Sequence, residues 1–393
     1  MTRYVIALSE LGIKNNNLIS LLLEHSLEIE DMFDESRHVF DNNLDLMIYF
    51  DMFNNEAKVS EALSKADTIL YHNKELGVKT TYYTASTYPI ELAKIDNPPA
   101  IIYYKGAEFN EISDKTIACV GTRKPTRLSY NAANYLIPQW VKEDCSIISG
   151  LACGVDKISH QACITAGGKT IAVLAHGLDM IYPKENLSLA DRILESGGIL
   201  MSEYPVGTKV DKFRFVNRNR LIVGMSRAVV IYECDAQGGT VHNVEHAIKQ
   251  HKPIFCPALG EEITEIQTGT KQLIDEKIAT VIKQGRDISG VLEAVGTSIT
   301  KDRMSNLQIK LNYLHSVLSI IHKPIVLEAT IRDMNLNIPI SNDMYTTFVD
   351  LFYKKHINID NLILSLVENN IACMNIMVRR SRQSGVARAT CPD

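Results

Sequence analysis

The residues with the clearest chemistry lie in the stretch 209–227. It contains six cations and a single anion, Asp211, although the chain as a whole has a formal net charge of −5. Arginine and lysine are common ligands of phosphate oxygens, and an aromatic ring such as Phe215 can stack on a nucleobase without reading its identity. Salt bridges or core packing could equally use Arg218, Arg220 and Phe215. The stretch predicts one wall of a phosphate-binding groove, with that alternative left open.

Glycine-rich loops provide a second chemical signal. Residues 121–127, GTRKPTR, hold three cations and no anion, and residues 149–160, SGLACGVDKISH, hold two glycines around a turn of small residues. Residues 237–240, QGGT, stand before a stretch of helical character. Glycine lets the backbone approach a phosphate, and a helix N-terminus adds partial positive charge. A tight turn with solvated charges is the alternative for the first loop.

Asp156 and His160 stand one helical turn apart in the second of these loops. Such a pair could act as acid and base. More often the aspartate caps a helix and the histidine is a hydrogen-bonded structural residue, which is the interpretation that we favour.

The elements that must position these residues form a regular succession from Thr116 onward, because short apolar runs alternate with stretches of helical length. Apolar strands need cover on both faces, and helices supply it through right-handed crossovers. We therefore expect an α/β fold, a Rossmann-like, doubly wound, mostly parallel sheet over residues 111–288, with ligands outside the carboxyl ends of the strands. The apolar runs lie at 116–121, 146–150, 170–177, 198–203, 228–233 and 253–258. The helical stretches lie at 127–143, 156–167, 185–196 and 240–250.

The regions that flank this core have different patterns. Residues 1–80 have apolar residues at three- and four-residue spacing, which predicts a small helical N-terminal domain. Residues 81–110 have β-branched and aromatic runs divided by prolines, which predicts a connecting segment of strands and turns. Residues 289–393 predict a small C-terminal domain of helices and a strand, compatible with a winged helix, and end in a basic tail.

Composition limits the classes of function. A net charge of −5 argues against a protein that coats nucleic acid with its whole surface, but it allows a local basic groove. The eight cysteines form no CxxC pair and several lie in apolar runs, which predicts reduced, buried thiols and a cytoplasmic location. No apolar run has the length of a membrane span, so no membrane insertion is expected. No metal site and no cofactor are predicted.

The order of the motifs resembles that of the DNA-processing protein A family, DprA, also called Smf. The resemblance covers about residues 60–285, and it implies a protein that binds and protects single-stranded DNA without sequence specificity. It further implies a homodimer that helps to load the RecA recombinase during natural transformation and has no catalytic activity. The motifs are GTRKPT, SGLACGVDKISH, GGKTIAVLAHGLDMIYP, GGILMSE, KFRFVNRNRLIVGMSRAVVIYE, QGGT and GTKQLI.

The resemblance also implies which residues contact DNA. Carried over motif by motif, they are Arg123, Lys212, Phe215, Arg218 and Arg220. With the glycine loops, the full set of candidate nucleic-acid-binding residues is Gly121, Thr122, Arg123, Thr126, Ser149, Gly150, Lys212, Phe215, Arg218, Asn219, Arg220, Gly238, Gly239 and Thr240.

This sequence departs from the family pattern at two places. Val216 stands where the family usually has a proline, which loosens a turn. The run that begins at Gly238 replaces a Ser-Gly-Ser-Leu-like run, so the hydroxyl-lined part of the pocket is altered.

Two other functions stay open. Residues 238–245, GGTVHNVE, resemble part of the PGGxGTxxE loop of phosphoribohydrolases that cleave nucleoside monophosphates, with Glu245 at the position of the glutamate. The chain has Val241 and His242 where that loop has its second glycine–threonine pair, which favours a helix-surface role for Glu245. A nucleotide sensor that signals to another protein would use the same pocket.

Overall fold

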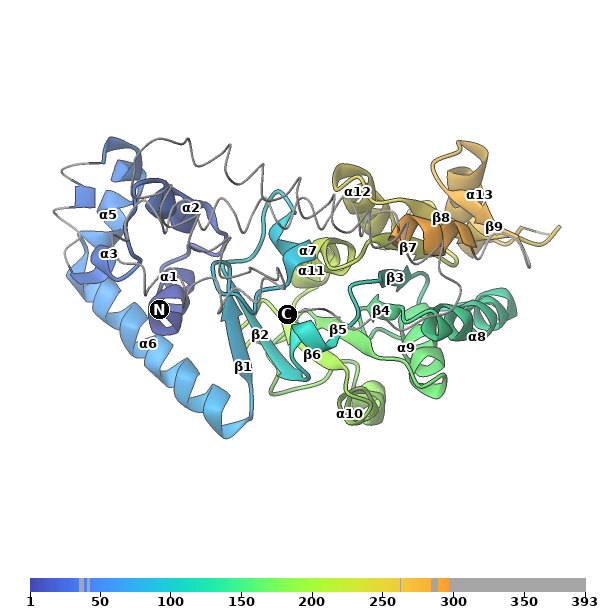
Figure 1. Cartoon of the computed structure of the whole chain (residues 1–393), viewed down its shortest axis with the longest axis horizontal. Helices are drawn as coiled ribbons and strands as arrows, with labels where there is room; N and C mark the ends of the chain where they lie inside the picture. Colours follow the sequence, from blue (N-terminus) through green and yellow to red (C-terminus); the bar gives the residue numbers. More distant parts are fainter. Residues whose placement is uncertain (35–38, 41–42, 262, 284–288, 297–393) are drawn as a thin grey trace, which may run out of the picture. The chain divides into compact units, whose positions relative to one another are not determined.

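A computed structural model describes residues 1–34, 39–40, 43–261, 263–283 and 289–296 (Figure 1). The chain divides into two compact units, Met1–Arg303 and Met304–Asp393, and all described residues lie in the first. Residues 289–296 are helical. The rest of the expected C-terminal domain and the basic tail lie outside the described residues, and the domain boundaries stay a prediction.

A nine-stranded sheet forms the centre of the described part, in the order β1-β2-β6-β5-β4-β3-β7-β8-β9. The strands from β3 to β9 pair in parallel, whereas β2 runs antiparallel to both β1 and β6. The expected α/β, Rossmann-like, mostly parallel sheet is confirmed. The strands are β1 Lys79–Tyr82, β2 Ile101–Gly106, β3 Thr116–Val120, β4 Ser146–Ser149, β5 Thr170–Leu174, β6 Ile199–Ser202, β7 Ala228–Ile231, β8 Ile254–Pro257 and β9 Thr280–Ile282.

The direction in which strands are added reverses at β3. Strands β4, β5 and β6 follow on one side of β3, and β7, β8 and β9 follow on the other side. The loops after β3 and β7 therefore lead to opposite faces of the sheet and leave a crevice at the carboxyl ends of these two strands.

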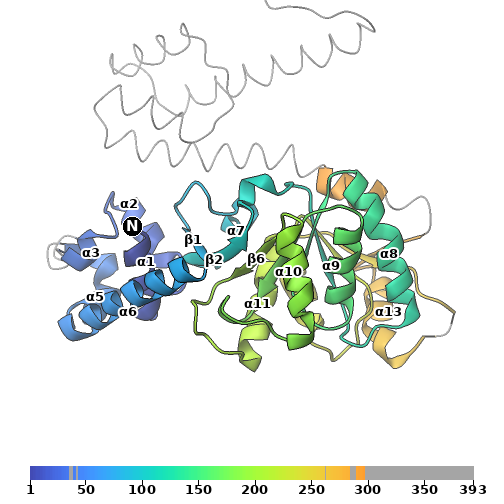
Figure 2. The ribbon, with the colours of Figure 1, turned by 90° about the horizontal axis from the view of Figure 1, so that it is seen from below.

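Helices cover both faces of the sheet. Successive residues of a strand point to opposite faces, so the sheet packs against helices on both sides. Ile117 and Cys119 of β3 pack with Trp140 of α8, whereas Ala118 and Val120 pack in the layer that contains α11 and α12. Figure 2 shows α8, α9 and α10 next to one another. The helices are α8 Arg127–Lys142, α9 Val155–Thr165, α10 Leu187–Glu195, α11 Lys212–Gly224, α12 Val241–Lys249 and α13 Thr268–Asp275.

Helices also form the part of the chain before β1. Helix α1 packs along α6, and buried side chains of both belong to a cluster that includes Ile101 and Tyr103 of β2. Residues 81–110 connect the N-terminal helices to the core and also contribute a strand to the sheet, because β2 pairs directly with β6. In the described part of the chain, no helix has the length and apolar character needed to cross a membrane. The elements are α1 Thr2–Glu10, α2 Asn17–Glu24, α3 Asp31–Asp34, η1 Leu44–Tyr49, α5 Phe50–Phe53, α6 Glu56–Glu75 and α7 Ile90–Ala93.

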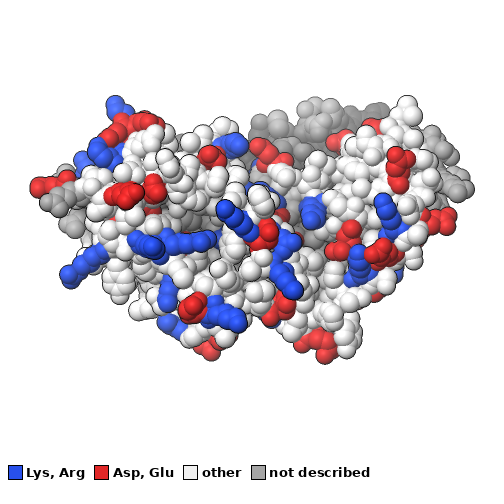
Figure 3. Space-filling view, turned by 180° about the vertical axis from the view of Figure 1, so that it is seen from behind, with Lys and Arg blue, Asp and Glu red and all other residues white. Residues whose placement is uncertain are grey.

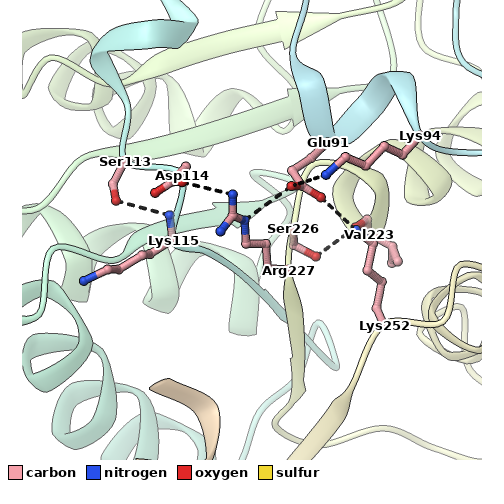
Figure 4. Close-up of polar contacts among 9 residues, drawn as sticks. All are labelled: Glu91, Lys94, Ser113, Asp114, Lys115, Val223, Ser226, Arg227 and Lys252. Atoms are coloured by element: carbon pink, nitrogen blue, oxygen red, sulfur yellow. Dashed lines mark hydrogen bonds and ion pairs between the residues drawn. The ribbon is translucent and has the colours of Figure 1, made fainter. Parts of the chain in front are cut away.

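A network of charged side chains fastens α7 to the amino ends of three strands (Figure 4). Glu91 Oε1 lies 3.3 Å from Arg227 Nε and 3.0 Å from Lys94 Nζ, and Glu91 Oε2 lies 3.2 Å from Lys252 Nζ. Arg227 also lies 3.0 Å from Asp114. Because Asp114, Arg227 and Lys252 come just before β3, β7 and β8, this network braces the sheet at the edge opposite to the crevice.

The apolar residues up to and including β7 belong to two elements. Residues from Leu221 up to Gly224 are the end of α11, and the strand begins at Ala228, as the apolar run 228–233 predicts. Asp211 starts the helix, because its Oδ1 accepts hydrogen bonds from Phe213 N at 2.9 Å and Arg214 N at 3.4 Å. Four cations of the stretch, Lys212, Arg214, Arg218 and Arg220, therefore lie in a helix, and Lys209 and Arg227 lie outside it.

The described cysteines are free, and all but Cys153 are buried. Burial raises the pKa of the Cys163 thiol to about 12 and that of the Cys119 thiol further. The expectation of buried thiols is confirmed for the described cysteines other than Cys153.

Candidate nucleic-acid interface

A cleft of about 720 Å³ opens at the carboxyl ends of β3 and β7. The loops after β3, β4, β7 and β8 form its walls together with one face of α11. Parallel strands bring their carboxyl ends to one edge, so residues far apart in the sequence meet here. Of the residues predicted from the sequence, the cleft is lined by Gly121, Thr122, Arg123, Lys212, Phe215, Arg218, Asn219, Gly238, Gly239 and Thr240.

Helix α11 supplies an aromatic and cationic wall. Lys212 is the first residue of the helix and is exposed. The Phe215 ring lies 5.7 Å from the ring of Tyr182, and the Arg123 guanidinium lies 5.9 Å from the centre of the Phe215 ring. A half-buried ring with cations beside it offers a stacking surface together with charge for a neighbouring phosphate.

The loop after β3 packs closely against the start of α9. Thr122 O accepts a hydrogen bond from Val155 N at 3.1 Å. Gly154 has a φ of +81°, and a Cβ at this position would collide with the backbone of Thr122 and Arg123. Glycine is required at 154 for both reasons, and the resulting contact fixes the backbone that carries Arg123.

Arg218 forms the floor of the cleft. Its guanidinium donates hydrogen bonds to Gly150 O at 2.7 Å and to Val173 O, and the residue is 4% exposed. Burial lowers the pKa of Arg218 to about 10, an effect that the charge of Asp156 opposes. A Cβ at Gly150 would collide with this guanidinium, so the glycine makes room for it.

The loop after β7 presents a bare helix N-terminus. Thr240, the N-cap residue of α12, makes no capping side-chain hydrogen bond. A Cβ at Gly239 would meet open space, so the backbone on this side of the cleft is accessible. Val241 N and Asn243 N already donate to Gly238 O and Thr240 O, so within the described residues the amides of Thr240 and His242 are the ones available to an anion.

In the described part of the chain, the cations of the cleft have no ion-pair partners, and its carboxylates bind backbone N–H groups. Within the described residues, Arg123, Lys124 and Lys212 take part in no ion pair. The carboxylates instead accept backbone N–H groups: Asp156 from Gly150 and Ala152, Asp211 from Phe213 and Arg214, and Asp235 from Gln237. Figure 3 shows both signs of charge interspersed over one face of the molecule.

Some predicted site residues do not line the cleft. Ser149 is buried and donates a hydrogen bond to Cys119 O at 2.7 Å, and Thr126 contacts the buried Glu233. Gly150 lies beneath the cleft, where its carbonyl holds Arg218. Arg220 forms an ion pair with Glu203, donates to Asn97 O at 3.1 Å, and lines a separate pocket of about 360 Å³. The alternative of a salt bridge is confirmed for Arg220.

Sequence reasoning missed several residues of the cleft. Lys124 and Tyr182 carried a usable signal, because each lies in a polar loop after a predicted strand. Asn243 and Ile266 carried none, because an asparagine within a helix and an isoleucine after a strand are ordinary residues.

The pair Asp156 and His160 has the structural role that we favoured, with one correction. The N-cap of α9 is Gly154, and Asp156 instead braces the preceding loop through Gly150 N and Ala152 N. His160 is fully buried, and its Nδ1 lies 2.7 Å from Thr170 Oγ1. The Thr170 hydroxyl donates to Ile147 O, so His160 Nδ1–H must be the donor to Thr170.

Glu245 lies on the exposed surface of α12. Its carboxylate lies 3.2 Å from His242 Nδ1, its side chain is 55% exposed, and it does not line the cleft. The helix-surface role of Glu245 is confirmed.

We expect the buried His160 to make the protein less stable in acid. Burial lowers the pKa of His160 from 6.5 to about 3, and the nearby charge of Arg218 acts in the same direction. Below pH 6.5 the unfolded chain binds a proton here that the folded protein does not bind. The free energy of unfolding should then fall by about 1.4 kcal/mol per pH unit down to about pH 3.

Urea unfolding at pH 7 and pH 5 tests this expectation. In His160→Asn, an amide nitrogen can take the place of Nδ1 without a titrating group, so the loss between the two pH values should be smaller by about 2 kcal/mol. Equal losses in the parent and the variant would contradict the assignment.

This chain is similar to several known proteins. The family model of DNA recombination-mediator protein A matches residues 79–293. DNA processing protein DprA of Bacillus subtilis strain 168 is 34% identical over 223 residues, which are 55% of this chain and 75% of that protein. Protein Smf of Synechocystis sp. PCC 6803 is 34% identical over 202 residues, and the chain spans about half of its length (50%). The X-ray structure of DprA from Streptococcus pneumoniae superposes with a TM-score of 0.58 at 27% identity, over 74% of this chain and 98% of that one.

Proposed function

Since the chain belongs to the DNA recombination-mediator protein A family, we propose that its cleft binds single-stranded DNA without regard to sequence, as part of DNA processing. One observation carries the proposal. Three cations without ion-pair partners in the described residues, Arg123, Lys124 and Lys212, lie in one cleft with the ring of Phe215. Cations that follow the phosphates and a ring that stacks on bases are the two elements that bind single strands.

Each part of the cleft has a separate task in this proposal. Lys212 and Arg123 neutralise phosphates, the N-terminus of α12 offers backbone N–H groups, and Phe215 stacks on one base. Arg218 keeps the floor in shape through its carbonyl partners. A duplex hides the faces of its bases, so the ring favours single strands.

The cellular role is the wider part of the proposal. We infer that the bound strand is protected and passed to the RecA recombinase during natural transformation, and that a homodimer does this in the cytoplasm. The support is membership of the family together with the resemblance of the sequence motifs. No catalytic step is assigned to the cleft.

The salt dependence of binding tests the role of Lys212. Lys212→Ala should weaken binding to all single-stranded sequences alike and reduce the slope of log K against log salt by about 0.7, because one phosphate contact is lost. Lys74→Ala, at an exposed position of α6, is the matched control and should leave the slope unchanged. A parental slope in Lys212→Ala would remove Lys212 from the interface.

Filter binding with three ligands tests the function as a whole. A thymidine oligonucleotide should bind, whereas the corresponding duplex and a free mononucleotide should bind much more weakly. Preference for the mononucleotide would favour the nucleotide-sensor function instead.

A further inference from the structure

Glu233 holds both ends of the loop that carries Arg123. Its backbone carbonyl, just after β7, accepts a hydrogen bond from Thr122 N at 2.7 Å. Its carboxylate accepts hydrogen bonds from Thr126 N at 2.8 Å and Thr126 Oγ1 at 2.6 Å. The residue is 0% exposed and does not line the cleft. Thr126 thus belongs to the support of the loop.

The same carboxylate reaches two further elements. Ser129 Oγ, in α8, donates to it at 2.5 Å, and Gln267 Nε2, in the short helix before α13, donates at 2.6 Å. Four hydrogen bonds therefore meet on one buried side chain. They join the end of β7, the start of α8 and the chain after β8, and these three segments stand around the same edge of the sheet.

We propose that Glu233 is a positioning residue that sets the place of Arg123 and Lys124 in the cleft without touching the ligand. The inference rests on the proposed function only for its binding readout. A loop held at Thr122 and Thr126 has little freedom between these points, so its two cations lie in the cleft, with Arg123 beside Phe215, before a strand arrives. Binding then does not have to order them.

The carboxylate is needed because its partners are fixed donors. Thr126 N–H cannot accept a hydrogen bond, and the amide of Gln267 is oriented, because its Oε1 accepts Thr264 N at 3.0 Å. In Glu233→Gln an NH₂ group faces one of these donors in either orientation. The hydroxyls of Thr126 and Ser129 can rotate to find other acceptors. The Thr126 N–H and the Gln267 NH₂ group cannot both find an acceptor on the new glutamine.

Glu233→Gln should weaken binding of a thymidine oligonucleotide by about tenfold, since a loop hydrogen bond to a charged group is lost. Hydrogen–deuterium exchange should show faster exchange of the amides of residues 122–124 and of Thr126, while the amides of β3 and β7 stay protected. Glu265→Gln is the matched control: it removes the same charge at an exposed position of the same short helix and should leave both measurements unchanged.

The double variant Glu233→Gln/Gln267→Glu provides the rescue. A carboxylate at position 267 could accept both Thr264 N and the NH₂ of the new amide at position 233, and the oxygen of that amide would accept Thr126 N. The variant keeps the net charge of the parent, and it should restore loop protection and most of the affinity. If Glu233→Gln does not fold, Ser129→Ala removes one donor more gently and should give a smaller change in the same direction.

The outcomes separate the two proposals. Parental exchange and parental affinity in Glu233→Gln would overturn the positioning role. Fast exchange in both Glu233→Gln and the double variant would overturn the positioning role as well. A general loosening of the structure would then explain the fast exchange. If the parent protein fails to bind the oligonucleotide, the proposed function fails, while the exchange pattern of the loop still tests Glu233.

Discussion

Phe215→Ala is expected to weaken binding of single-stranded DNA by about 1–3 kcal/mol, the range found when a base loses its aromatic stacking partner. The ring lies in the cleft beside Tyr182 and beside the guanidinium groups of Arg123 and Arg218, each 5.9 Å from its centre. Its loss removes the surface on which a base would lie but leaves the cations. The slope of log K against log salt should therefore stay near that of the parent, unlike the slope of Lys212→Ala.

Phe213 gives a matched control in the same helix. Its side chain is 78% exposed and does not line the cleft, so Phe213→Ala should bind the oligonucleotide as the parent does. Fluorescence anisotropy at two salt concentrations measures both variants. Equal losses for Phe213→Ala and Phe215→Ala would mean that the strand does not enter the cleft.

Arg218→Met is expected to lower the free energy of unfolding by about 3–5 kcal/mol, because a buried charge loses its compensating partner. Gly150 O and Val173 O would lose a donor, and Asp156 would remain buried without the positive charge that opposes the rise of its pKa. Urea unfolding of the parent and the variant gives this difference directly.

A double-mutant cycle identifies the cause of that loss. In Asp156→Asn the amide oxygen can still accept Gly150 N and Ala152 N, so this single change should cost less than Arg218→Met. Adding it to Arg218→Met should recover part of the stability, since no buried carboxylate then lacks a partner. Additive losses would show that the two charges are not coupled.

The same variant distinguishes a supporting role from direct contact. If Arg218 shapes the floor, folded Arg218→Met should keep the parental salt slope. A slope reduced by about 0.7 would instead identify Arg218 as a phosphate ligand, as the sequence resemblance implies.

The sequence by itself determined the succession of elements in the core. Runs such as 116–121 and 228–233 predicted β3 and β7, and the stretch 127–143 predicted α8, because their apolar periods and lengths differ clearly. Helix α11 was harder, since Leu221 to Val223 and Ala228 to Ile231 together look like one apolar run. In the structure they are separated at Met225, the C-cap residue of α11, whose N–H donates to Leu221 O before β7 begins at Ala228.

The location of the cleft also followed from the sequence, since parallel strands gather their carboxyl ends at one edge. This rule brought Arg123, Lys212 and Phe215 together, although 89 positions separate the first two (212 minus 123). Which cation stays available was decided by the tertiary structure. Arg218 and Arg220 lie two positions apart, yet one donates to strand-end carbonyls and the other to Glu203. A charge is available to a ligand only if folding leaves it without a partner, and its partners come from distant segments that its own neighbours in the sequence do not reveal.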